Sequence, residues 1–151
     1  MNAHDVLNGK VEVQGNVVII GGGLVGAETA DLLSQFCKVS IIEMLPQIMK
    51  DGEHSTTRYM LERFQKNGVN VHTSTKLLEI GDHAILAEHA GRNFMIEHVD
   101  TVVIAVGVCT DTTLLQQLDQ LACPTIRVGD ANGVKNGYLG IREGFEAGLY
   151  I

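Results

Sequence analysis

The feature that most constrains this chain is the stretch VVIIGGGLVGAETADLL, residues 17–33, in which three glycines follow directly on an apolar run. The valines and isoleucines are typical of a strand buried on both faces, and the residues after Gly23 predict a helix. Gly21, Gly23 and Gly26 match the pattern G-x-G-x-x-G at this strand-to-helix turn. In that pattern one glycine makes the tight turn, one admits a pyrophosphate to the backbone, and one packs the helix against the strand. A tight connection without a ligand uses the same glycines, so the motif gains weight only from its context.

A second strand supplies that context. The segment KVSIIE, residues 38–43, ends in Glu43, about 20 positions after the first glycine, where the dinucleotide fingerprint expects an acidic residue. A carboxylate there accepts hydrogen bonds from both hydroxyls of an adenosine ribose and repels a 2′-phosphate, which favours NAD(H) over NADP(H). The alternative for Glu43 is a solvated residue at the end of a strand.

The pattern also predicts which residues contact the dinucleotide. An anion rests on the N-terminus of a helix because backbone N–H groups point at it. Gly107 closes a later apolar strand, and ligands of open α/β sheets bind at that edge, so the far half of the cofactor is expected there. The contacts expected at the pyrophosphate come from Gly21, Gly22 and Gly23 and the amides of Leu24 and Val25, with Gly26 completing the motif.

Composition excludes several classes of function. A net charge of -7 without any basic run argues against nucleic acid binding, although small anions can still bind backbone amides. The N-terminus lacks the pattern of a secretion signal and no apolar run approaches ~18 residues, so a cytoplasmic protein is expected. The six histidines are scattered without ligand spacing, so neither a metal site nor a catalytic residue is predicted. The cysteines Cys37, Cys109 and Cys123 form neither a CxxC motif nor a disulfide framework.

The order of elements along the chain predicts the fold class. The 151 residues fit one α/β domain, and the pattern is that of a Rossmann-like parallel sheet in which a three-stranded antiparallel β-meander replaces one crossover helix. An amphipathic helix, ended by Asn67-Gly68, precedes the third strand. After the first two strands, the expected elements are the helix 54–68, a strand in 69–75, meander segments 76–80, 83–89 and 93–99, a strand 100–107, a helix 110–121, a strand 125–130 and a helix 137–151.

Four motifs in order carry a family resemblance over essentially the whole chain. The segments NVVIIGGGLVGAETADLL, VSIIEMLPQI, VDTVVIAVG and IRVGDANGVKNGYLGIREGFEAG together resemble the C-terminal part of NADH:flavin oxidoreductases of the 2-enoate reductase and 2,4-dienoyl-CoA reductase group. That part is similar to the pyridine nucleotide-disulfide oxidoreductases. In this family an NAD(H)-binding domain is inserted into an FAD-binding domain.

The resemblance implies a division of the chain and two further cofactor contacts. Residues 1–15 would be a linker leading into the domain, 16–107 the dinucleotide-binding core, and 108–151 a return segment resembling the second half of an FAD-binding domain. Asp130 would accept a hydrogen bond from the flavin ribityl chain, and the amides opening the following helix would face the FAD pyrophosphate. Glu28 resembles a glutamate near the nicotinamide. From the residues alone, Asp130 is also compatible with a capped turn and Glu28 with an ordinary helix residue.

Departures from the family define the expected function. The FMN barrel, the iron-sulfur cysteines and the first FAD fingerprint are absent, so the resemblance implies a fragment without tightly bound FAD. Cys109 and Asp111 stand in a loop where relatives usually carry a proline and an asparagine.

The full enzyme would pass hydride from NADH to flavin and onward to FMN, reducing an activated C=C bond. The alternative is a non-catalytic NAD- or ADP-binding module. Expected partners are the dinucleotide, the missing flavin-binding half and FMN barrel, and a second copy of the chain if the uncovered surface self-associates.

Overall fold

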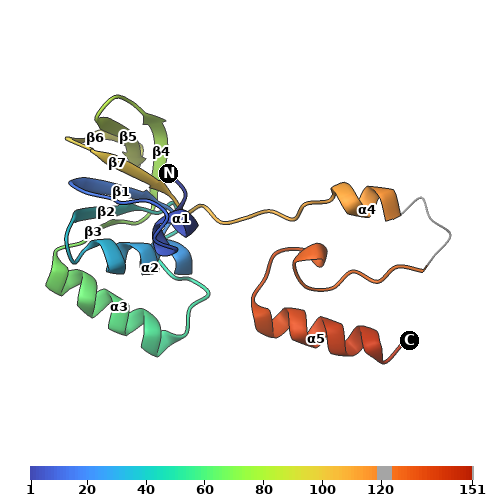
Figure 1. Ribbon diagram of the computed structural model, residues 1–151. Helices are drawn as coiled ribbons and strands as arrows, with labels where there is room; N and C mark the ends of the chain where they lie inside the picture. Colours follow the sequence, from blue (N-terminus) through green and yellow to red (C-terminus); the bar gives the residue numbers. More distant parts are fainter. Residues whose placement is uncertain (119–123, 151) are drawn as a thin grey trace. The chain divides into compact units, whose positions relative to one another are not determined.

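The computed structural model describes residues 1–118 and 124–150 and divides the chain into two units, Met1–Gly107 and Val108–Ile151 (Figure 1). The first unit contains a parallel sheet with strands in the order β3-β2-β1-β7. Its central strand β1 pairs in parallel with β2 on one side and with β7 on the other. These strands are β1 (Asn16–Ile20), β2 (Lys38–Ile42), β3 (Asn70–His72) and β7 (Thr101–Ile104).

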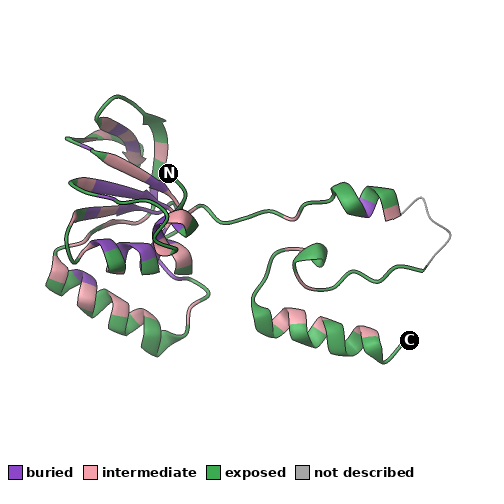
Figure 2. Ribbon diagram, viewed as in Figure 1, coloured by how far each residue is buried: buried purple, intermediate pink, exposed green. Residues whose placement is uncertain are grey.

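Alternate residues of β1 enter two different hydrophobic clusters. Val17 and Ile19 pack with α2 (Leu24–Leu33) and with Phe64 of α3 (His54–Asn67). Val18 and Ile20 pack on the other side, with residues of the meander such as Ile85. The parallel sheet is therefore a middle layer between helices and meander, which explains why β1 is apolar without alternation; Figure 2 shows its buried strands.

The meander forms a separate antiparallel sheet in the order β4-β5-β6. Its strands are β4 (Thr75–Ile80), β5 (Ala84–His89) and β6 (Arg92–Glu97), with an irregularity in β4 between Leu77 and Glu79. It stands between β3 and β7 in the chain, where a helix would otherwise make the crossover. The predicted fold class is confirmed. The helix α3 also ends at the predicted Asn67-Gly68, where Gly68 is left-handed with φ 72°.

The first 15 residues, expected as a linker, contain the short helix α1 (Ala3–Leu7). Ala3 and Val6 of this helix are buried in the same cluster as Val17. Because two apolar residues three positions apart share one helix face, the segment gains stability by packing on the core. It is part of the first unit's core.

The second unit contains α4 (Thr113–Leu118), the 3₁₀ turn η1 (Gly129–Asn132) and α5 (Gly137–Gly148). The predicted strand 125–130 is wrong: residues 125–128 have no regular structure and η1 follows them. A strand needs a neighbour for its hydrogen bonds, and the described part of this unit contains no other strand. The end of the predicted helix 110–121 and Cys123 lie outside the described residues. Among the described helices, none has the length and apolarity that crossing a membrane requires.

Candidate functional site

The turn between β1 and α2 is tight because two of its glycines leave no room for a side chain. Gly21 has φ 102°, a conformation that favours glycine, and a Cβ there would overlap the carbonyl oxygen of Ala105. A Cβ on Gly26 would overlap the carbonyl oxygen of Gly21. The first and third glycines of the motif therefore hold β1, β7 and α2 in close contact.

Gly23 is different because it faces open space. It is the N-cap of α2 with an extended backbone, no side chain caps the helix, and a Cβ at Gly23 would meet no atom within 4 Å. The first N–H groups of a helix have no partner within the helix. The amides of Gly23, Leu24 and Val25 thus form the part of the turn best suited to bind an anion.

Gly22 is enclosed by protein. Its N–H donates to Oε2 of Glu43 at 2.6 Å, and its carbonyl oxygen accepts from the N–H of Met49 at 2.7 Å. The Gly21 N–H likewise donates to the carbonyl oxygen of Ile42, at 2.9 Å. Two of the amides expected at a pyrophosphate are therefore bonded inside the protein, so Gly21 and Gly22 contribute shape to the site.

Glu43 follows β2 and is only 8% exposed. Besides the Gly22 N–H, its carboxylate accepts the N–H of Leu45 through Oε1 at 2.7 Å. Glu43 therefore does not project freely from a strand end, as the solvated alternative would require. A carboxylate has about four acceptor positions, so two bonds leave capacity for further donors.

A cavity of about 690 Å³ opens at the carboxyl edge of the parallel sheet. This volume is typical of small-molecule and cofactor sites. Its apolar walls include Met44 and Leu45. Its charged lining residues are Lys50 and Lys76 together with the acidic Glu43 and Asp51. Seven of the ten predicted site residues line it, namely Gly21, Gly22, Gly23, Leu24, Val25, Glu43 and Gly107.

The other three predicted residues lie elsewhere. Gly26 is buried beneath the turn, Glu28 is exposed on α2 and does not line the cavity, and Asp130 belongs to the second unit. The wall that sequence reasoning missed comes from β4, residues 75–77, and from 49–51. No local motif marks these residues, because the sheet topology brings them to the cavity.

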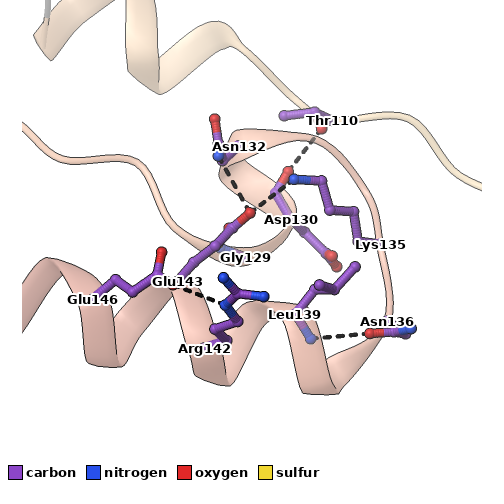
Figure 3. Close-up of polar contacts among 10 residues, drawn as sticks. All are labelled: Thr110, Gly129, Asp130, Asn132, Lys135, Asn136, Leu139, Arg142, Glu143 and Glu146. Carbon is purple, nitrogen blue, oxygen red and sulfur yellow. Dashed lines mark hydrogen bonds and ion pairs between the residues drawn. The ribbon is translucent and has the colours of Figure 1, made fainter.

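Asp130 lies in η1, a turn held by hydrogen bonds with Glu143 and Thr110 (Figure 3). The N–H of Gly129 donates to Oε2 of Glu143 at 2.8 Å, and the hydroxyl of Thr110 donates to the Asp130 carbonyl oxygen at 2.7 Å. Lys135 Nζ donates to Oε1 of Glu143 at 2.8 Å. The Lys135 ammonium, followed by the Gly129 amide, holds the pKa of Glu143 below its usual range. The turn is thus fixed by its backbone, and Asp130 is exposed.

The start of α5 is capped from within. Asn136 Oδ1 accepts the N–H of Leu139 at 3.0 Å, so this amide, among those expected to face a pyrophosphate, is already bonded (Figure 3). The importance of Glu143 was not foreseen, because a glutamate in a predicted helix carries no signal that it turns back to a loop.

The remaining cysteine and histidine side chains show no metal site in the described residues. Cys109 is exposed, and burial raises the pKa of the Cys37 thiol. Burial, followed by the charge of His89, lowers the pKa of His72.

Comparisons with known proteins extend over nearly the whole chain. Residues 2–133 match the family model described as pyridine nucleotide-disulphide oxidoreductase. A bilirubin reductase from Mediterraneibacter gnavus is 37% identical over 91% of this chain and 23% of its own length. A cinnamate reductase from Clostridium sporogenes is 32% identical over 99% of this chain and 23% of its own length. The solved structure of a 2-naphthoyl-CoA reductase superposes with a TM-score of 0.83 and 28% identity over 100% of this chain and 23% of its own. The chain therefore spans about a quarter of the length of these relatives.

Proposed function

The chain belongs to the pyridine nucleotide-disulphide oxidoreductase family, and from that premise we propose that it is the NADH-binding part of a longer flavin-dependent oxidoreductase. In the longer protein, hydride would pass from NADH to a flavin, and an activated C=C bond would be reduced. Relatives named for cinnamate and 2-naphthoyl-CoA support this substrate class, since both compounds carry unsaturation conjugated to a carbonyl group.

The observation that carries the proposal is the open N-terminus of α2 at the cavity. The amides of Gly23, Leu24 and Val25 meet the cavity where no side chain caps the helix. A pyrophosphate placed there accepts hydrogen bonds from backbone donors and gains from the helix dipole. Lys50 and Lys76 line the same cavity but are balanced there by Glu43 and Asp51, so the attraction for an anion comes from the backbone amides.

Glu43 gives the site its preference among dinucleotides. Glu43 lines the cavity, where its carboxylate would accept hydrogen bonds from the adenosine ribose hydroxyls and repel a 2′-phosphate. Met44 and Leu45, which follow it, offer apolar surface to the adenine. The nicotinamide half would extend toward Gly107 at the end of the sheet.

The nicotinamide and flavin supply the hydride chemistry, whereas this chain supplies binding and orientation. In the second unit the exposed Asp130 fits a contact with a hydroxyl of the flavin ribityl chain, because its turn is already fixed by Thr110 and Glu143. Glu28 is exposed on α2 and does not line the cavity. It would contact the nicotinamide only if the nicotinamide half of NADH extended beyond the cavity. We assign FMN and an iron-sulfur cluster to other parts of the longer protein, and we place the reaction in the cytoplasm.

Calorimetric titration of the purified chain with NADH, and in parallel with NADPH, tests the proposal. We expect saturable binding of NADH and weaker binding of NADPH. If neither nucleotide binds, the glycine turn is only a structural connection and the proposal fails. Equal binding of both would remove Glu43 from the ribose site.

A second function is favoured by one observation: every residue lining the cavity belongs to the first unit. Such a unit would serve as a non-catalytic NAD- or ADP-binding module without any flavin. An assay of NADH oxidation with added FAD separates the two functions, because a module binds NADH without oxidising it.

A further inference from the structure

The Glu43 carboxylate connects two walls of the cavity that are distant in sequence. One oxygen accepts the N–H of Gly22 in the glycine turn, and the other accepts the N–H of Leu45 in the segment after β2. The distances are 2.6 and 2.7 Å, and Glu43 is 8% exposed. Hydrogen bonds to an ionised acceptor are stronger than neutral ones, and little water reaches this carboxylate to replace them.

The backbone around Glu43 extends the same network. The Glu43 N–H donates to the His72 carbonyl oxygen and its own carbonyl oxygen accepts the N–H of Thr75, both at 2.9 Å. Glu43 is therefore bonded to the end of β3 and the start of β4 through its backbone, and to the glycine turn through its side chain. Glu43 thus joins the glycine turn, the segment after β2 and the start of β4, three of the walls of the cavity.

Gly22 is closely enclosed, and its two backbone hydrogen bonds go to the Glu43 carboxylate and to the N–H of Met49. A Cβ there would lie 2.5 Å from Cγ2 of Ile48 and 3.1 Å from Cβ of Glu43. Its N–H is buried in this contact, and a buried amide without an acceptor is costly. Removing the carboxylate would force Gly22, and with it Gly23, to move toward another acceptor or toward water.

We propose that Glu43 is a positioning residue for the phosphate-binding turn, in addition to its contact with the ribose. This inference rests on the proposed function, since it assigns the pyrophosphate to the amides that follow Gly22. Its consequence concerns specificity. A ribose contact alone predicts that a neutral side chain at position 43 weakens NADH and relieves the repulsion of NADPH. A positioning role predicts that NADPH binding is weakened too, because both nucleotides carry the same pyrophosphate.

The test compares Glu43→Gln with Glu97→Gln, a matched control at an exposed site on β6 that does not line the cavity. A carboxamide can accept from only one of the two N–H groups and presents its own donors to the other. In Glu43→Gln we expect at least tenfold faster hydrogen exchange at the Gly22 or Leu45 amide, read by NMR without any nucleotide. We also expect about tenfold weaker binding of NADPH as well as of NADH, on the scale of one lost charge-assisted hydrogen bond. Glu97→Gln should change neither measurement.

Two outcomes overturn the inference. Unchanged amide exchange in Glu43→Gln means that the carboxylate does not hold the turn. The second outcome is faster amide exchange in Glu43→Gln together with NADPH binding as tight as, or tighter than, in the wild type. It means that the hydrogen bonds from Glu43 fix the turn but do not contribute to binding the phosphates.

Failure of the proposed function is recognised separately, because the wild type would then bind no nucleotide. In that case Glu43 fixes the turn for no nucleotide, and the positioning role is rejected whatever the amide exchange shows. If Glu43→Gln fails to fold, Glu43→Asp provides the same comparison. It keeps the charge but cannot span both amides, so both nucleotides should again bind more weakly.

Discussion

Gly23 and Gly26 stand three residues apart in one turn and are glycines for different physical reasons. A side chain at Gly26 would overlap the Gly21 carbonyl oxygen, whereas a side chain at Gly23 would enter open space beside the cavity. The first constraint concerns folding, and the second concerns the space that a ligand would occupy.

Gly23→Ala should separate binding from folding. We expect the variant to keep its fold with a small loss of stability, since alanine is a poorer N-cap than glycine, by roughly 1 kcal/mol or less. NADH affinity should fall at least tenfold, because the methyl group takes the place of the approaching phosphate. Thermal unfolding by circular dichroism and calorimetric titration measure the two effects.

Gly26→Ala is the matched contrast in the same helix turn. Its methyl group has no space, so the midpoint of thermal unfolding should fall far more than in Gly23→Ala. If the two variants lose stability equally, the assignment of separate roles to the two glycines is wrong.

At the residue scale, sequence patterns identify the residues that belong to a motif and miss the contacts that arise only when distant segments fold together. The glycines and Glu43 follow from spacing, because the chemistry of a dinucleotide fixes where they must stand. The bonding of Gly22 to Glu43 could not be foreseen, since it depends on the pairing of β1 with β2 and on a side-chain rotamer. The contribution of Lys76 to the cavity depends on how the meander packs.

Among the elements, the contact of η1 with α5 depends on one carboxylate. Glu143 has a pKa below its ordinary value, so its contacts add stability that is present above the unfolded-state pKa of about 4.3. That stability is lost as the pH falls through the lower folded-state pKa. We therefore expect the Gly129 amide signal to shift on acidification in this range, and its protection against hydrogen exchange, relative to an unstructured amide at the same pH, to fall, as followed by NMR.

Two substitutions in α5 check the assignment of this pH dependence. Glu143→Gln should remove it, because a carboxamide does not titrate. Glu146→Gln, which removes the ion pair with Arg142, should leave the Gly129 signal unchanged. A pH dependence that survives in Glu143→Gln would assign it to another group.

The helix α5 also exposes an apolar stripe. Tyr138, Ile141 and Phe145 of α5 and the C-cap residue Leu149 follow one another at helical spacing, and each is 68% to 77% exposed. We expect the chain to self-associate at increasing concentration through this face, and Phe145→Ser to reduce the association. Light scattering over a concentration series measures both, and a concentration-independent monomeric mass for the wild type would contradict the expectation.

The same unit shows where element prediction from sequence stops. Residues 125–128, TIRV, have the composition of a strand, yet no strand forms there, because composition alone does not decide whether a strand forms. In the first unit every predicted strand found a neighbour, and the meander was recognised from its short turns. Strand composition is thus informative only where the chain also supplies the rest of the sheet.

At the scale of the whole molecule, both hydrophobic clusters consist of residues from the first unit. The cavity also lies entirely within it. A chain shortened to residues 1–107 should therefore fold, keep the thermal midpoint of the first unit and bind NADH with the affinity of the longer chain. Calorimetry on both chains tests this, and a loss of binding beyond about tenfold in the shorter chain would show that the second unit contributes to the site.

The pairing of β1 with β7 brings together the beginning and the end of the first unit. Because β1 and β7 are far apart in the chain, the entropy lost on closing this loop is larger than for the other strand pairs, and we expect this pairing to be a late step in folding. Ala105 and Gly107 follow β7, so the nucleotide site is completed only after that step. A ribosome must therefore release almost the whole unit before the nascent chain can bind NADH. In stopped-flow experiments NADH should therefore slow unfolding and leave the refolding rate unchanged. The nucleotide would stabilise the folded unit without taking part in its folding.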